Sequence, residues 1–114
     1  MQNPEEQIDF TFWLHASQFV IGEARWLNES VSAKQMRDFL GKLDGRPAAV
    51  VGLFISMSGF TEPAMRYLRQ QSAKHTVLTV SDADLAAILR GEPELPEWLT
   101  RALRARFEHP FGDT

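Results

Sequence analysis

Three charged residues near the N-terminus, Asp9, Glu23 and Arg25, lie on two segments of alternating polarity. If these segments pair as a hairpin across a three-residue turn at 15–17, Asp9 faces Glu23, and Arg25 lies two residues further along the same face. Carboxylates about 5 Å apart repel each other unless a cation relieves them. A hard divalent ion such as Mg²⁺ (or Mn²⁺) is the usual cation, held also by waters and phosphate oxygens. The spacing therefore predicts a metal site beside which the guanidinium steadies a water or a phosphate.

A second interpretation of the same residues stays open at this point. Asp9 is then an ordinary surface residue, and Glu23 forms a salt bridge with Arg25 alone. A change of one residue in the turn moves every side chain of a strand to the other face, which removes the pairing of the two carboxylates.

The elements that must position these residues are two N-terminal strands. Residues 8–14 alternate strictly, with Asp9, Thr11 and Trp13 on one face and apolar side chains on the other. Residues 18–26 return as a second strand after a short turn, so the sequence predicts an antiparallel hairpin.

A helix and a buried strand are expected next. Ser32 and Gln35 have the spacing of a capping box, so the helix begins there, and Gly45 is placed as its stop. Residues 50–57 are almost continuously apolar, as in a strand that is buried on both faces.

The remaining residues predict one more strand and three helices. Thr61 is the expected cap of the second helix, and residues 76–80 form the next strand. Ser81 begins a third helix, and an amphipathic last helix follows from residue 95. The order β-β-α-β-α-β-α-α predicts one α/β domain: a mixed central sheet flanked by helices, with an N-terminal hairpin and a C-terminal amphipathic helix.

Composition narrows the class of protein. The 114 residues are 44% hydrophobic and 24% charged and contain no cysteine, which fits one globular domain without disulfides or thiolate metal sites. The longest uncharged run, roughly residues 48–61, is too short and too interrupted by Gly and Ser to cross a bilayer. The acidic start is unlike a secretory signal, so a cytoplasmic location is expected.

Charge is unevenly distributed, although the net charge is only −3. Residues 1–24 carry four acids and no base, whereas residues 25–47 carry five bases and three acids. A strongly basic footprint for nucleic acid is absent, and only a local patch could contact phosphates.

Several segments, taken in order, carry a family resemblance. They are residues 7–9 (QID), 23–26 (EARW), 31–43 (VSAKQMRDFLGKL), 52–61 (GLFISMSGFT) and 77–91, a strand followed by Asp-x-Asp-Leu. Together they resemble the Mrr-like branch of the PD-(D/E)xK restriction-endonuclease-like superfamily. The resemblance covers roughly residues 5 to 91 and implies a restriction-endonuclease-like three-layer fold that acts on DNA with a divalent metal.

The resemblance also implies roles for single residues. It carries Asp9 onto the metal-binding aspartate of the PD motif and Glu23 onto the acid of the (D/E)xK motif. Arg25 stands where the family has lysine, and an arginine stays protonated and acts only as a fixed cation. Lys34 or Lys42 of the following helix is expected to substitute for the missing lysine.

A further departure from the family concerns the start of the chain. Relatives normally have a helix and a strand before the aspartate, so residues 1–91 are expected to form a core that lacks them, with residues 92–114 as a helical extension packed on the same domain. The sheet edge and apolar face left open invite pairing. A homodimer, or a place within a longer protein or larger assembly, is therefore expected.

Two functions of different class follow from these observations. The first is a Mg²⁺-dependent DNA endonuclease, weakened or inactive because of the arginine; the second is a catalytically silent DNA-binding or protein-interaction module that keeps the fold. The candidate DNA contacts are Lys34, Gln35, Lys42, Arg66 and Arg69. For the two arginines, a solvated helix face is the competing interpretation.

Overall fold

The computed structural model describes residues 7–14, 18–26, 28–46, 50–72, 74–90 and 95–108. The elements are β1 (Gln7–Leu14), β2 (Gln18–Arg25), α1 (Ala33–Gly41), β3 (Val51–Ser56), α2 (Glu62–Gln70), β4 (Thr76–Val80), α3 (Asp82–Leu89) and α4 (Leu95–Glu108). Their order confirms the predicted succession of strands and helices. The predicted turn at 15–17 lies outside the described residues.

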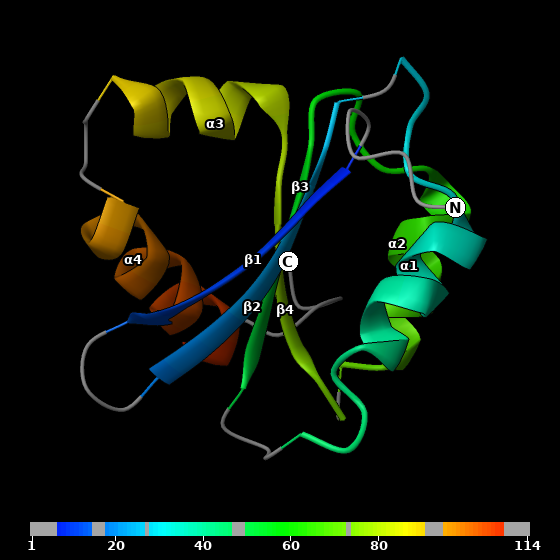
Figure 1. Ribbon diagram of the computed structural model, residues 1–114, viewed down its shortest axis with the longest axis horizontal. Helices are drawn as coiled ribbons and strands as arrows, with labels where there is room; N and C mark the ends of the chain where they lie inside the picture. The colour runs from blue at the N-terminus through cyan, green and yellow to red at the C-terminus, as the bar shows by residue number, and fades with distance from the viewer. Residues whose placement is uncertain are drawn as a thin grey trace.

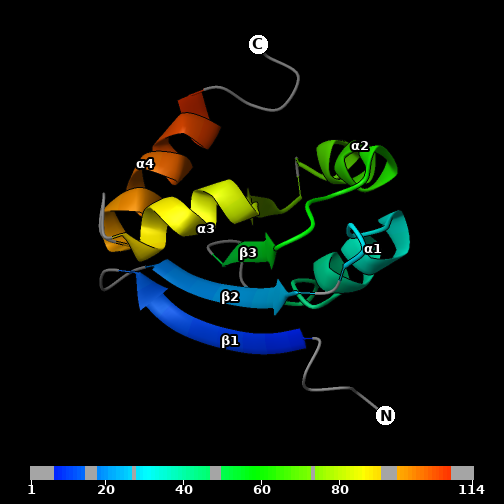
Figure 2. The ribbon, with the colours of Figure 1, turned by 90° about the horizontal axis from the view of Figure 1, so that it is seen from above.

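The strands form a mixed sheet between two layers of helices. Its order is β1-β2-β3-β4, with β1 antiparallel to β2 and the other neighbours parallel. The helices α1 and α2 lie on one face, and α3 and α4 lie on the other (Figures 1 and 2). Both crossover helices, α1 and α2, share a face because right-handed crossovers between successively added parallel strands place them there. The three-layer α/β prediction is confirmed.

The first helix begins as predicted but ends earlier. Ser32 Oγ accepts from the Gln35 N–H at 3.2 Å and Gln35 Oε1 accepts from the Ser32 N–H at 2.9 Å, which completes the capping box. The helix ends at Gly41, because backbone bonds between residues three apart tighten the segment 42–46 into a turn. Gly45 has a φ of 80°, so it lies within this turn rather than directly after the helix.

Side chains of α1 and of the turn that follows it pack against Gly52 of β3. A Cβ atom there would lie 2.9 Å from Leu43 Cδ1 and 3.0 Å from Phe39 Cε2, so a larger residue would require these side chains to move. The buried cluster between the sheet and the helices α1 and α2 consists of Ile21, Val31, Met36, Phe39, Leu40, Leu43, Phe54, Ala64, Leu68 and Val77. This packing fixes where the end of α1 meets the hairpin.

The opposite face of the sheet is covered by α3 and α4. Its buried cluster consists of Leu14, Val20, Val51, Leu53, Leu78, Val80, Leu99 and Leu103. Leu99 and Leu103 come from α4, so this helix packs on the sheet. The proposed boundary near residue 91 stays a prediction.

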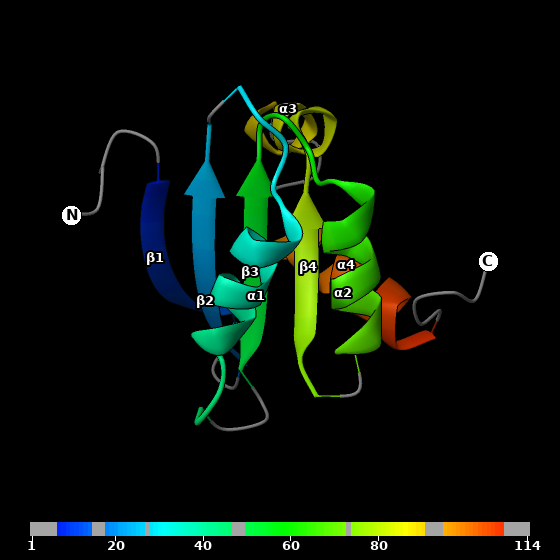
Figure 3. The same cartoon turned by 90° about the vertical axis from the view of Figure 1, so that its right-hand side faces the viewer.

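The edge strand β1 is open on the α1 side. Figure 3 shows α1 over β2 and β3, with no described helix in front of β1. Trp13 is accordingly 63% exposed, although it packs against Phe19 with ring centroids 4.9 Å apart. Within the described residues, β1 is thus an edge strand and no described helix covers its face on the α1 side. The expected loss of a first helix and strand stays a prediction. No helix within the described residues is long and apolar enough to cross a membrane.

Candidate active site

The register of the hairpin brings the two carboxylates together. Asp9 pairs with Glu23, Thr11 with Ile21 and Trp13 with Phe19, as the sequence predicted. Asp9 and Glu23 point to the same side of the sheet, because both carboxylates bond one ammonium group, that of Lys42. The geometric condition for a shared cation site is met.

Glu23 is the buried member of the pair. Its side chain is only 2% exposed, yet both oxygens have charged partners: Oε2 accepts from Arg25 Nε at 2.7 Å and Oε1 accepts from Lys42 Nζ at 2.7 Å. A buried carboxylate without such partners would be strongly destabilising. The positive charges of Arg25 and Lys42 therefore compensate the negative charge of the buried Glu23 carboxylate.

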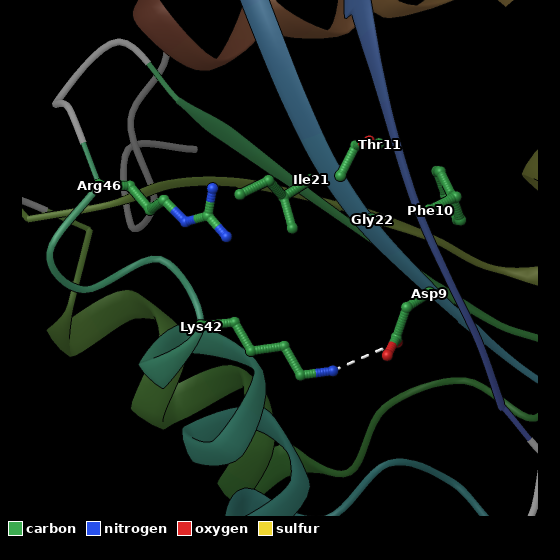
Figure 4. A pocket seen from close by; sticks show the side chains of 7 residues that line it. All are labelled: Asp9, Phe10, Thr11, Ile21, Gly22, Lys42 and Arg46. Carbon is green, nitrogen blue, oxygen red and sulfur yellow. Dashed lines mark hydrogen bonds and ion pairs between the residues drawn. The ribbon is translucent and has the colours of Figure 1, made fainter.

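Lys42 bridges the two strands from outside the sheet. Its Nζ also donates to Asp9 Oδ1 at 3.2 Å (Figure 4). The residue caps the C-terminal end of α1, and the turn that follows brings Arg46 to the same hollow as residues of the hairpin. Of the two lysines expected to substitute for the motif lysine, Lys42 is the one at the carboxylates.

Gln7 links Asp9 to Arg25 through its side-chain amide. It was not predicted as a site residue. Its Nε2 donates to Asp9 Oδ1 at 2.9 Å, and its Oε1 accepts from Arg25 Nη2 at 2.8 Å. The signal was available, because Gln7 lies two residues before Asp9 on the same face and pairs with Arg25 in the hairpin register. We call Gln7, Asp9, Glu23, Arg25 and Lys42 the ion network.

The ion network shifts two protonation equilibria. Partial burial alone would raise the pKa of Asp9, but hydrogen bonds from Gln7 and Lys42 and the positive charges of Lys42 and Arg25 outweigh it and lower that pKa. Burial alone would lower the pKa of Lys42, but the hydrogen bonds and negative charges of Glu23 and Asp9 raise it above its ordinary value. Lys42 is therefore an ammonium ion at neutral pH and not a base.

The other candidate DNA-contacting residues have different surroundings. Lys34 donates to Asp38 one turn further along α1, at 3.1 Å, and Gln35 is engaged in the capping box. Arg69 of α2 pairs with Glu62 at 3.0 Å, and Arg66 is exposed on the same helix. None of the contacts found for these side chains involves the ion network, and their role in binding DNA stays a prediction.

A hollow of about 450 Å³ lies beside the ion network. It is lined by Asp9, Phe10, Thr11, Ile21, Gly22, Lys42 and Arg46. Lys42 and Arg46 form one side of it and the hairpin forms the other (Figure 4). Arg46 was not predicted from the sequence, because its place depends on how the turn after α1 folds back.

The donor set suits a hard divalent cation. Asp9 and Glu23 offer carboxylate oxygens that already converge on one cationic nitrogen, and Mg²⁺ is bound by one or two carboxylates with waters and phosphates completing its shell. No group of three or more acidic, histidine or cysteine side chains that could hold a metal is found among the described residues. The protein would thus supply two ligands and leave the other positions to water and substrate.

Fold and site together define a class of proteins. A mixed sheet between two helical layers, with paired carboxylates on its antiparallel hairpin, is the architecture of restriction-endonuclease-like domains. The sequence model of the family Mrr_cat, restriction endonuclease, matches residues 2–89, and the chain belongs to this family. Members of the family are typically metal-dependent and act on DNA. No curated protein matches the chain.

Proposed function

We propose that this protein is a Mg²⁺- or Mn²⁺-dependent DNA endonuclease that hydrolyses phosphodiester bonds at the ion network. The observation that supports it best is the convergence of the Asp9 and Glu23 carboxylates on the single ammonium group of Lys42. Two carboxylates held against a shared cation are what a divalent ion needs from a protein in phosphoryl chemistry.

The four charged residues of the ion network have roles in this proposal. Asp9 and Glu23 hold the cation, which when bound polarises a phosphodiester oxygen and favours an attacking water. Arg25 fixes the orientation of Glu23 through Nε and acts as a fixed cation. Lys42, whose pKa is raised, supplies positive charge for the phosphate as negative charge develops on it.

The activity is tested by nicking of supercoiled plasmid with Mg²⁺ or Mn²⁺. Asp9→Asn and Glu23→Gln should each lower the rate at least about 100-fold, since each removes a carboxylate ligand. Asp38→Asn is the matched control, because Asp38 is also an exposed carboxylate that accepts from a lysine of α1. Equal cleavage by the wild type and by both site variants would sink the proposal.

A silent DNA-binding module is the second candidate, and one observation favours it. Both oxygens of Glu23 already bond protein cations, so the folded chain neutralises its buried carboxylate with its own residues. A silent module would bind a DNA duplex without nicking it at any divalent-ion concentration, and Asp9→Asn would leave the binding unchanged.

We further propose that a second copy of the chain, or a neighbouring part of a larger protein, covers the open edge of β1. Among the described residues β1 is an edge strand of the sheet and its Trp13 is exposed, and such an edge invites pairing with another chain. Sedimentation velocity over a hundredfold range of concentration should show a dimer in the upper part of the range. A single monomeric species throughout would contradict self-association.

A further inference from the structure

The ammonium group of Lys42 occupies the space that a divalent cation would need. Both carboxylate oxygens lie within hydrogen-bond distance of this one nitrogen, Glu23 Oε1 at 2.7 Å and Asp9 Oδ1 at 3.2 Å. A Mg²⁺ ion approaches its oxygen ligands to about 2.1 Å. An ion that binds both of these oxygens therefore competes for them with Lys42 Nζ.

Of the two cations on Glu23, Lys42 is the one free to leave. Arg25 is 18% exposed and is tied to Glu23 and Gln7 together. Lys42 is 38% exposed and is attached through a flexible four-carbon stem. Two carboxylates balanced by Arg25 and Lys42 carry no net charge, so an added divalent ion repels the nearer, more mobile cation.

The hollow beside the ion network offers Lys42 a place to go. It is large enough for a phosphate group, and Lys42 already lines it together with Arg46 (Figure 4). No hydrogen bond or ion pair of the Arg46 guanidinium is found within the described residues. Displacement of Lys42 toward Arg46 would create a pair of cations next to the carboxylates. Such a pair suits a phosphate of a nucleic-acid strand.

We propose that Lys42 is an exchangeable counter-ion: it holds the place of the divalent cation in the metal-free protein and moves into the hollow when the cation binds. There it joins Arg46 as a ligand of a substrate phosphate. The inference rests on the proposed function, because that function identifies the two ligands as a divalent cation and a DNA phosphate. The proposal makes the binding of the cation and the binding of the DNA strand favour each other. Both are favoured when Lys42 moves from the carboxylates into the hollow.

The first test measures Mn²⁺ binding directly, by electron paramagnetic resonance of the free ion, with no DNA present. Lys42→Met and Lys42→Gln should bind Mn²⁺ at least tenfold more tightly than the wild type, because no internal cation competes. Lys34→Met is the matched control, since it removes one lysine charge from α1 but leaves Asp9 and Glu23 with their partners; it should bind like the wild type. Unchanged or weaker binding by both Lys42 variants would overturn the proposal.

Loss of folding is monitored separately in the same variants. Lys42→Met leaves Glu23 with Arg25 as its charged partner, whereas Lys42→Gln keeps a hydrogen-bond donor without the charge. Thermal unfolding by circular dichroism shows which variant is folded, and the Mn²⁺ comparison is made on that one. Asp9→Asn placed in the folded Lys42 variant should lower Mn²⁺ affinity again, and failure to do so would place the ion elsewhere and overturn the proposal.

The second test measures the coupling with a fluorescent DNA duplex and Ca²⁺, a divalent ion used here to observe binding without cleavage. Ca²⁺ should raise the DNA affinity of the wild type at least threefold, and Lys42→Gln should remove most of this increase. Arg46→Ala should weaken binding and reduce the slope of log K against log salt by about 0.9, the value for one phosphate contact. Arg104→Ala, on α4 across the sheet, is the control. An undiminished Ca²⁺ effect in Lys42→Gln would overturn the proposal.

These outcomes separate the inference from the function on which it rests. A wild type that nicks DNA while the Lys42 variants bind Mn²⁺ no better contradicts the exchangeable counter-ion and leaves the endonuclease standing. Tighter Mn²⁺ binding by the Lys42 variants, with no cleavage by the wild type, supports the exchange and contradicts the endonuclease.

Discussion

The two halves of the sheet are built on different principles. In the parallel half, β3 and β4, apolar side chains are buried on both faces, with Phe54 and Val77 toward α1 and α2 and Leu53 and Leu78 toward α3 and α4. In the hairpin half, β1 is covered on one face only, and its open face carries Asp9, Thr11 and the exposed ring of Trp13. β2 belongs to both halves, since it begins in the core and ends in the ion network.

On the proposed function, this difference places the residues that stabilise the fold and the residues that bind ligands in different parts of the sheet. Close packing on two faces makes the parallel half rigid and intolerant of change. Ionic groups that exchange partners need access to water, and the open face of β1 provides it next to a buried carboxylate. The apolar half can therefore hold the hairpin in register while the hairpin offers its carboxylates to a ligand.

The largest effect on stability is expected from Phe54→Ala in the parallel half. Phe54 is fully buried, and its ring lies 4.7 Å from that of Phe39 and 5.4 Å from that of Phe60, measured between centroids. Removing it should lower the free energy of unfolding by about 3–5 kcal/mol, through lost burial and the cavity left behind. Urea unfolding followed by circular dichroism measures the loss, and Phe54→Leu should cost clearly less. A loss below about 1 kcal/mol would show that this half does not dominate stability.

A smaller loss is expected from Glu23→Gln at the end of β2. The amide leaves Arg25 and Lys42 without their buried counter-charge, but both cations reach water, so we expect a loss of about 1–3 kcal/mol rather than the full cost for a buried pair. Glu62→Gln, which breaks an exposed pair with Arg69, is the control and should change stability by less than about 0.5 kcal/mol. If both variants lower the free energy of unfolding by the same amount, the ion network does not stabilise the fold. The parallel half and the hairpin half would then differ in their contribution to stability more than we infer.

The fold and the carboxylate pair were predictable because local rules determine them. The period of two in residues 8–14 sets which side chains share a face, and the spacing to Glu23 sets its partner. The capping box at Ser32 and the cap at Thr61 involve residues three apart, so sequence alone locates these helix starts. These signals depend on neighbours in the chain and not on how the elements pack.

The rest of the site depends on packing that the sequence does not reveal. Lys34 and Lys42 were equal candidates on one helix, and the choice between them follows from the approach of α1 over Gly52 and from the turn after Gly41. Lys42 and Asp9 are 33 residues apart, and no periodic pattern links them. Arg46 was missed for the same reason, because the turn that carries it folds back toward the hairpin only in the tertiary structure.

A still smaller effect is expected from Trp13→Ala on the open face of β1. The side chain is large but mostly exposed, and the aromatic contact found for it is with Phe19, so the loss should be about 1 kcal/mol or less. Urea unfolding at two protein concentrations tenfold apart is the measurement. A loss that grows with concentration would show that a second copy covers the ring, and the hairpin half would then be as buried as the parallel half.

The smallest effect is the pH dependence contributed by Asp9, which tests whether the open end of the hairpin is ionic in solution. Its pKa is lowered in the folded protein, so ionised Asp9 stabilises the fold above its unfolded-state pKa of about 4, and this stabilisation is lost as the pH falls through the folded-state value. The difference in Tm between the wild type and Asp9→Asn should therefore be positive at neutral pH and vanish in acid. Lys42 has a raised pKa, so its contribution persists through neutral pH and is lost only in strong alkali, above about pH 10.5. The difference in Tm between the wild type and Asp9→Asn should thus be constant from about pH 6 to pH 9. A difference that persists unchanged to about pH 2 would mean that Asp9 makes no ionic contact with Lys42, and exposure alone would then distinguish the two halves of the sheet.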